Sequence, residues 1–323
     1  MNKKLILFAM ALLAVMAFAC NKKQTTDGSA NDTITTPITY TGTGSVTQGL
    51  GIKAINSLYN CSGGRVTSVG AITSSDGKIW TVPADVAFSN SPKLPDLYNE
   101  CNGKTPASIS AVDTTNVPVT VIDPDGVIVS GYIFCDNYFE LYINGKLLGV
   151  DAVPYTPFNS CFVKFKARRP IKYAVKLVDW EENMGIGSEN NGTDPLHPGD
   201  GGFIAKFSDG TQTGSAWKAQ VFYIAPLADP NCITENGSAR TSAGCNLPAS
   251  ASKAYALHWA LPATWYSADY NFSSWPAATT YSNTVVGAKE PYTNFAPQFG
   301  AAQFIWSSNL VLDNLVLLRF TGN

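Results

Sequence analysis

The feature that most constrains the fold is the sequence YFELYINGKLLG, residues 138–149. Its first half alternates, so it predicts a strand with one aliphatic and aromatic face and one more polar face. Asn144-Gly145 is the preferred residue pair for a type I′ turn, whose twist matches the strands that it joins. We therefore expect an antiparallel hairpin with its apolar face buried. Phe139, Leu141 and Ile143 form that face, and Tyr138, Glu140 and Tyr142 form the other. We interpret the two tyrosines as cross-strand partners rather than as an exposed platform.

The rest of the body has the same character. VPVTVIDPDGVIVSGYIF, residues 117–134, contains two β-branched runs separated by a turn, in which Pro124 presets φ and Gly126 tolerates a positive φ. No segment has the pattern of a long amphipathic helix. Many short strands separated by Gly, Pro and Asn predict an all-β protein, an antiparallel β-sandwich or jelly roll. Further runs of strand length begin at residues 161, 172, 201, 217, 255 and 315.

The chain begins with MNKKLILFAMALLAVMAFAC, in which two lysines precede an uncharged apolar run. The run is too short for a spanning helix and predicts a secretory signal over residues 1–19. Ala17 and Ala19 fit an ordinary cleavage site. They also fit a loose lipobox, in which Cys20 becomes the lipidated first residue.

Cysteine counting favours the lipidated alternative. The chain has seven cysteines, and exported proteins tend to pair their thiols, so an odd cysteine needs a role. A lipid on Cys20 leaves an even set of six. Residues 20–47 are rich in Thr, Ser, Gly and Asn and predict a flexible tether. We therefore expect a bacterial lipoprotein anchored to the outer membrane or cell surface. The alternative is a soluble secreted protein with one free cysteine.

The six remaining cysteines allow 15 disulfide connectivities. Pairing of nearest neighbours is the preferred interpretation, and the spacing around residue 240 favours it because a polar Gly-containing loop separates the last two cysteines. No C-x-x-C spacing is present that would favour a metal site. The preferred pairs are Cys61 with Cys101, Cys135 with Cys161, and Cys232 with Cys245.

Composition excludes several functions. Without the two signal lysines the formal charge falls from -2 to -4, and no basic cluster remains that would bind nucleic acid. His197 lies in a loop-like segment, and His258 lies in a strand-like run where a structural role is expected. The chain has no nucleophile elbow, no H-E-x-x-H motif and no phosphate-binding loop, so we expect a non-catalytic protein.

Five segments in order resemble the galactose-binding-like β-sandwich modules of family 2 glycosidases and α-L-rhamnosidases. They are DNYFELYINGKLLG, SDGTQTGSAWKA, NFSSWPAA, AAQFIWSS and LVLLRF, and the resemblance covers residues 117–323. It implies a β-sandwich with loop insertions at residues 181–202 and 226–256. Such modules are accessory to catalysis, so the resemblance implies no activity. Residues 48–116 are expected to form a small β segment, either a subdomain or extra strands packed on the sandwich.

The loop from Asp179 to Asp200 is the predicted binding site. Its carboxylates and amides alternate with glycines, and hard oxygen ligands on a flexible backbone suit Ca²⁺. The alternative is a polar insertion that solvates itself. An aromatic ring beside carboxylates and amides also suits a sugar subsite, although a Trp at a strand end is commonly part of the core. The predicted metal ligands are Asp179, Glu182, Asp194 and Asp200, and the predicted sugar contacts are Trp180, Glu181 and Asn183.

Three functions remain open from the sequence. The first is a surface lipoprotein that binds glycans without catalysis, and it is the interpretation that we prefer. The second is an adhesin or structural envelope subunit that recognises a surface protein. The third is an atypical hydrolase, which would need a pair of carboxylates about 5–10 Å apart in a cleft.

Overall fold

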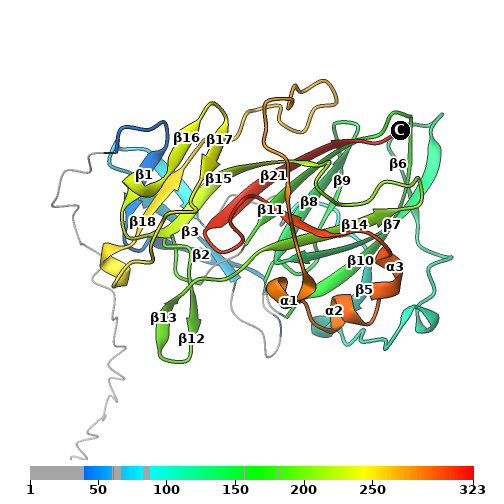
Figure 1. Ribbon diagram of the computed structural model, residues 1–323. Helices are drawn as coiled ribbons and strands as arrows, with labels where there is room; N and C mark the ends of the chain where they lie inside the picture. Colours follow the sequence, from blue (N-terminus) through cyan, green and yellow to red (C-terminus); the bar gives the residue numbers. More distant parts are fainter. Residues whose placement is uncertain (1–39, 60, 62–66, 83–87, 156, 180–181) are drawn as a thin grey trace, which may run out of the picture. The chain divides into compact units, whose positions relative to one another are not determined.

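The computed structural model describes residues 40–323, except residues 60, 62–66, 83–87, 156 and 180–181 (Figure 1). Two seven-stranded sheets contain most of the strands, and nearly all strand pairs in them are antiparallel. The predicted all-β sandwich is therefore confirmed.

The first sheet, sheet I, carries the predicted hairpin at one edge. All its strand pairs are antiparallel. Its strands in spatial order are β1 (Ser45–Gln48), β18 (Tyr255–His258), β15 (Lys218–Leu227), β21 (Asp313–Thr321), β11 (Lys172–Val178), β8 (Tyr138–Ile143) and β9 (Lys146–Val150).

The second sheet, sheet II, is antiparallel apart from one short strand that pairs with β10 in parallel. Its main path is β19 (Thr279–Tyr281), β20 (Phe304–Trp306), β14 (Gly202–Phe207), β7 (Val127–Asp136), β10 (Asn159–Ala167) and β5 (Asp96–Asn99), and the parallel strand is β6 (Val119–Val121).

Aromatic side chains from both sheets fill the space between them. The Phe139 ring of sheet I lies 5.9 Å from the Phe203 ring of sheet II, and the Tyr173 ring lies 4.8 Å from the Phe207 ring. Each buried aliphatic or aromatic side chain contributes roughly 1.5–3 kcal/mol. The predicted apolar face of β8 belongs to this core, because Phe139, Leu141 and Ile143 are at most 1% exposed.

The hairpin turn also follows the prediction. Asn144 and Gly145 have φ angles of 50° and 80°, which are those of a type I′ turn. The other face of β8 is covered as well: Tyr138 is fully buried, and Glu140 pairs with Lys176 of β11 at 3.3 Å. The choice of cross-strand partners over an exposed tyrosine platform is confirmed for Tyr138.

Gly126 has a different role from the predicted one. Its φ is not among the positive values, so the turn after Pro124 does not use the freedom of glycine there. A Cβ at this position would lie 2.2 Å from the carbonyl carbon of Ala167. Glycine is required because the backbone of β10 approaches closely.

The expected boundary between the tether and the β segment, at residue 48, falls within a strand. Residues 45–47, which composition placed in the tether, form β1 and are buried against β18. Their pairing partners lie in a distant part of the sequence, so local composition could not reveal them. Within 48–116, β5 joins sheet II, while three strands form a separate sheet with a turn at SSDGK, residues 74–78. These are β2 (Ile52–Tyr59), β3 (Thr67–Thr73) and β4 (Ile79–Val82).

The remaining elements are short. Two hairpins lie outside the main sheets, β12 (Glu189–Asn191) with β13 (Asp194–His197) and β16 (Thr234–Asn236) with β17 (Ala239–Thr241). The helices are α1 (Asn283–Val286), α2 (Glu290–Thr293) and α3 (Ala296–Phe299), with 3₁₀ turns at Glu100–Asn102, Ile109–Ala111, Pro230–Cys232 and Ala251–Lys253. Among the described residues, no helix has both the length and the apolarity needed to span a bilayer.

Candidate functional site

The predicted loop, residues 179–202, is largely closed on itself. Trp180 and Glu181 lie outside the described residues. The side-chain amide of Asn183 donates to Ser188 Oγ at 3.1 Å and to Asn190 Oδ1 at 3.3 Å, and Glu182 accepts a hydrogen bond from the Asn190 backbone at 2.8 Å. These polar groups therefore stabilise the loop conformation.

The same loop also packs on the small sheet. Met184 is buried in a cluster with Ile72 of β3 and Val82 of β4. Asp194 accepts a hydrogen bond from the backbone of Leu196 at 2.9 Å, at the start of β13. Much of this segment is thus a structural connection between the small sheet and the sandwich.

The four predicted calcium ligands separate into two groups. Asp179 and Asp200 act on Asp136, which lies at the end of β7. Burial raises the pKa of Asp136, and the negative charges of Asp179 and Asp200 raise it further. Burial and the charge of Glu189 raise the pKa of Asp200 to about 6. Glu182 and Asp194 instead bind backbone amides within the loop.

No group of three or more His, Cys, Asp or Glu side chains with metal-binding geometry occurs in the described part of the chain. Calcium binding therefore stays a prediction. The carboxylates that interact with one another in this region are those of Asp136, Asp179 and Asp200. Asp136 was not among the predicted ligands.

Two of the three expected disulfides are present. Cys61 bonds Cys101, and Cys232 bonds Cys245. Cys20, the predicted lipidation site, lies outside the described residues.

The prediction for Cys135 and Cys161 was wrong, because both are buried free thiols. Cys161 of β10 stands opposite Ile133 of β7, so Cys135 is its diagonal neighbour two residues further along. Diagonal pairs are roughly 7–8 Å apart, whereas the Cβ atoms of a disulfide are about 3.8 Å apart. Nearest-neighbour order along the chain could not reveal this offset in register.

The two histidines also differ in position. His258 of β18 is buried between the rings of Trp80 and Tyr223, 5.2 Å and 4.6 Å away, and Thr47 Oγ1 lies 3.0 Å from its Nε2. Burial lowers its pKa to about 3, so it is neutral, and the expected structural role is confirmed. His197 lies at the end of β13.

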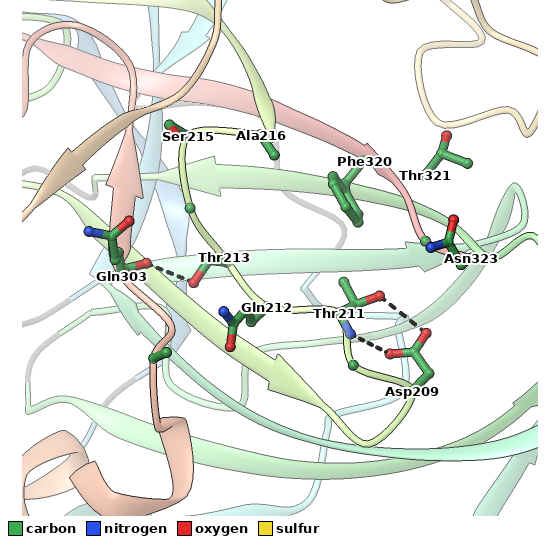
Figure 2. Close-up of a pocket in the computed structure, with 14 residues that line it drawn as sticks. Asp209, Thr211, Gln212, Thr213, Ser215, Ala216, Gln303, Phe320, Thr321 and Asn323 are labelled. Atoms are coloured by element: carbon green, nitrogen blue, oxygen red, sulfur yellow. Dashed lines mark hydrogen bonds between the residues drawn. The ribbon is translucent and has the colours of Figure 1, made fainter.

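A groove of about 520 Å³ lies at one end of the sandwich, away from the predicted loop. It is bounded by the loop after β14 and the residues before β20, both from sheet II, and by the end of β21 from sheet I (Figure 2). The predicted loop precedes β14, whereas the groove follows it. Since β14 has six residues, the two regions are separated by roughly 20 Å. Residues 209–216, 301, 303 and 320–323 line the groove.

An aromatic stack supports the groove from below. Phe320 is half-buried, and its ring lies 5.1 Å from the fully buried ring of Trp217, nearly parallel to it. The indole nitrogen of Trp217 donates to the Gln212 carbonyl at 2.9 Å, which holds the loop over the stack. The exposed part of the Phe320 ring is therefore held in a fixed position by Trp217.

Internal hydrogen bonds fix the shape of the loop. Asp209 accepts from the Thr211 backbone at 2.9 Å and from Tyr173 Oη at 2.9 Å. The Thr213 hydroxyl donates to the Gln303 carbonyl at 2.7 Å, and the Gln303 backbone donates to the Thr213 carbonyl at 3.0 Å (Figure 2). These bonds join the loop to the start of β20, so that both walls of the groove are held in place.

The groove offers neutral hydrogen-bonding groups. The side chains of Gln212, Ser215 and Gln303 are exposed and form no hydrogen bond with other described residues. Asp209 is the only ionisable side chain in the described lining, and both of its carboxylate oxygens already accept hydrogen bonds. The groove therefore suits an uncharged polar ligand.

Sequence reasoning did not assign this site. The segment SDGTQTGSAWKA was noted only for its resemblance, although its polar, Gly-containing start directly after a strand was the available signal. The other walls come from residues 301, 303 and 320–323, which lie much further along the chain.

Compared with known proteins, the chain matches no family model, no curated protein and no solved structure at the significance level required.

Proposed function

We propose that this chain is a non-catalytic, lipid-anchored bacterial surface protein that binds carbohydrate in the groove at residues 209–216, 301, 303 and 320–323. The observation that carries the proposal is the composition of the groove, whose lining combines exposed amides and a hydroxyl with a phenyl ring that stacks on Trp217. Sugars have hydroxyl groups that both donate and accept hydrogen bonds, and they also have an apolar face of C–H groups that packs on aromatic rings.

The sequence supports the same proposal. One of the five segments that resemble galactose-binding-like modules is SDGTQTGSAWKA, which forms the loop of the groove. The signal-like residues 1–19, Cys20 and the polar residues after it suit a protein held at the outer membrane or cell surface. At that location a sandwich on a tether would reach extracellular or periplasmic glycans.

A glycan array tests the proposal. The full chain with Cys20→Ser, which removes the predicted lipid attachment, should retain a defined set of neutral glycans. Gln212→Ala should weaken retention at least about fivefold, because it removes a hydrogen bond worth roughly 1 kcal/mol.

Two matched variants complete the test. Gln298→Ala removes the same type of side chain from α3, outside the groove, and should leave binding unchanged. Trp180→Ala reports on the predicted loop site. Loss of binding in Trp180→Ala with full binding in Gln212→Ala would place the sugar in the loop and contradict the groove proposal. Absence of any glycan ligand would refute carbohydrate binding altogether.

The other two functions make different predictions. An adhesin or envelope subunit would show no glycan affinity and would crosslink to a surface protein in intact cells. A hydrolase would need two accessible carboxylates, whereas the described groove lining contains Asp209 alone.

A further inference from the structure

We infer that the sugar recognised by the groove carries an acetamido group, as in a neutral N-acetylhexosamine. This inference rests on the proposed function and narrows its ligand class. It follows from the particular polar groups, the apolar groups and the charge of the groove.

The polar groups include two primary amides that line the same groove, those of Gln212 and Gln303. Two hydrogen bonds tie the backbone of Gln303 to Thr213, the residue next to Gln212, so that both side-chain amides border the same stretch of loop. In the view of Figure 2, Gln212 and Gln303 lie near Thr213. A primary amide has one carbonyl acceptor and two N–H donors, and an acetamido group has the complementary N–H donor and carbonyl acceptor.

A gap of about the size of a methyl group lies beside one of these amides. Gly214 follows Thr213 in the loop, and a Cβ built at Gly214 would lie 3.6 Å from Gln303 Oε1. Because glycine has no side chain, this side of the Gln303 amide is open to a ligand. The backbone of Gly214 does not have a positive φ, so an alanine there would fit the backbone while narrowing the space.

The groove also has an apolar part. The Phe320 ring can cover one face of a sugar ring. Ala216 and Ala301 add two exposed methyl groups to the lining. An acetamido group ends in a methyl group, and its burial against such side chains is favourable. The acetamido group would therefore bond to the glutamine amides and pack its methyl group against the alanines.

Charge separates this ligand from acidic sugars. The described lining contains no Lys or Arg that would pair with a carboxylate or a sulfate. Its single ionisable side chain, Asp209, is acidic and would repel them. Lys172 and Arg169 do donate to two lining residues, to Thr321 Oγ1 at 3.2 Å and to the Asn323 carbonyl. The preference for a neutral over an acidic sugar is therefore expected only of the stretch formed by Asp209, Gln212 and Gln303.

Saturation-transfer NMR and titration calorimetry on the full chain with Cys20→Ser test the inference. The probes are the methyl glycosides of N-acetylglucosamine, N-acetylgalactosamine, glucose and galactose. We expect the acetamido methyl protons to receive the strongest saturation. We also expect at least one acetamido sugar to bind about tenfold more tightly than its parent hexose, which corresponds to about 1.4 kcal/mol.

Variants locate the source of the preference. Gln303→Ala and Gly214→Ala should reduce it to about twofold or less, while Gln298→Ala should preserve it. Equal binding of the acetamido sugars and their parent hexoses would overturn the inference and leave the proposed function standing. Binding of none of the probes, together with a glycan array without any ligand, would refute both. A preference that survives Gln303→Ala and Gly214→Ala would also overturn the inference, because the acetamido group would be recognised elsewhere.

Discussion

Replacing Asp313 by asparagine should remove one identifiable part of the pH dependence of stability. Asp313 is fully buried at the start of β21, and its carboxylate accepts hydrogen bonds from Ser307 Oγ at 2.5 Å and from Ser242 Oγ at 3.1 Å. Burial raises its pKa to about 7 despite those bonds, because two hydroxyl groups do not replace the hydration of a charge. An asparagine at this position can accept from one serine and donate to the other.

The sign and size of the effect follow from linkage. The folded state holds the proton more tightly than the unfolded state, in which the pKa is about 3.9, so the free energy of unfolding falls as pH rises from about 4 to 7. At about 1.4 kcal/mol per pKa unit, ionisation of Asp313 costs roughly 4 kcal/mol above pH 7 and roughly 1.5 kcal/mol at pH 5. The free energy of unfolding of Asp313→Asn, relative to that of the native chain, should therefore rise by about 2.5 kcal/mol between pH 5 and pH 8.

Urea unfolding followed by tryptophan fluorescence at pH 5, 6, 7 and 8 measures this difference. Other acids with a raised pKa, such as the half-buried Asp200, titrate in both proteins and cancel in the comparison. Asp125→Asn is the control, because Asp125 is exposed. Its free energy of unfolding should differ from that of the native chain by the same amount at all four pH values. Parallel curves for the native chain and Asp313→Asn would show that the Asp313 proton is held no more tightly than in the unfolded chain, and the reasoning would fail.

Three further outcomes are expected. Replacing Cys232 and Cys245 by alanine should lower the free energy of unfolding by about 3 kcal/mol, the entropy of closing a loop of about 14 residues; an unchanged urea midpoint would contradict this. Cys135 and Cys161 should react with a thiol reagent only after unfolding, giving two thiols in a chain whose predicted lipidated cysteine is replaced by serine; a count of zero would mean that they are bonded. If residues 179–200 bind Ca²⁺, millimolar CaCl₂ should raise the melting temperature and a chelator should reverse it, whereas equal melting in both would end the calcium proposal.

Where one segment carries its own information, the sequence predicted the structure well. The type I′ hairpin was readable because Asn144-Gly145 and the alternation around it are local signals. The disulfide between Cys232 and Cys245 was readable because the short loop keeps the two thiols close in any fold. These predictions needed no knowledge of the neighbouring strands.

Features that depend on register or on distant partners were missed. β1 forms because Val46 and Thr47 pair with β18, and nothing in a Thr- and Gly-rich segment indicates that strand. The offset between Cys135 and Cys161 depends on how β7 aligns with β10. The groove combines three segments that are far apart in the sequence, so it becomes visible only when the sheets are assembled.

The position of the groove follows from how fully the hairpin strand is covered. β8 buries its apolar face between the sheets, and on its other face Tyr138 and Glu140 are also buried. A strand whose two faces are covered stabilises the fold but offers no surface to a ligand. Near such a strand, a rigid site forms where strands end, because the loops there are exposed and fixed to the core. At the end of β21 the buried Trp217 meets Phe320, and the loop after β14 is bonded to the start of β20. The contribution of the hairpin to the proposed site is therefore the rigidity of the sheet whose edge it forms.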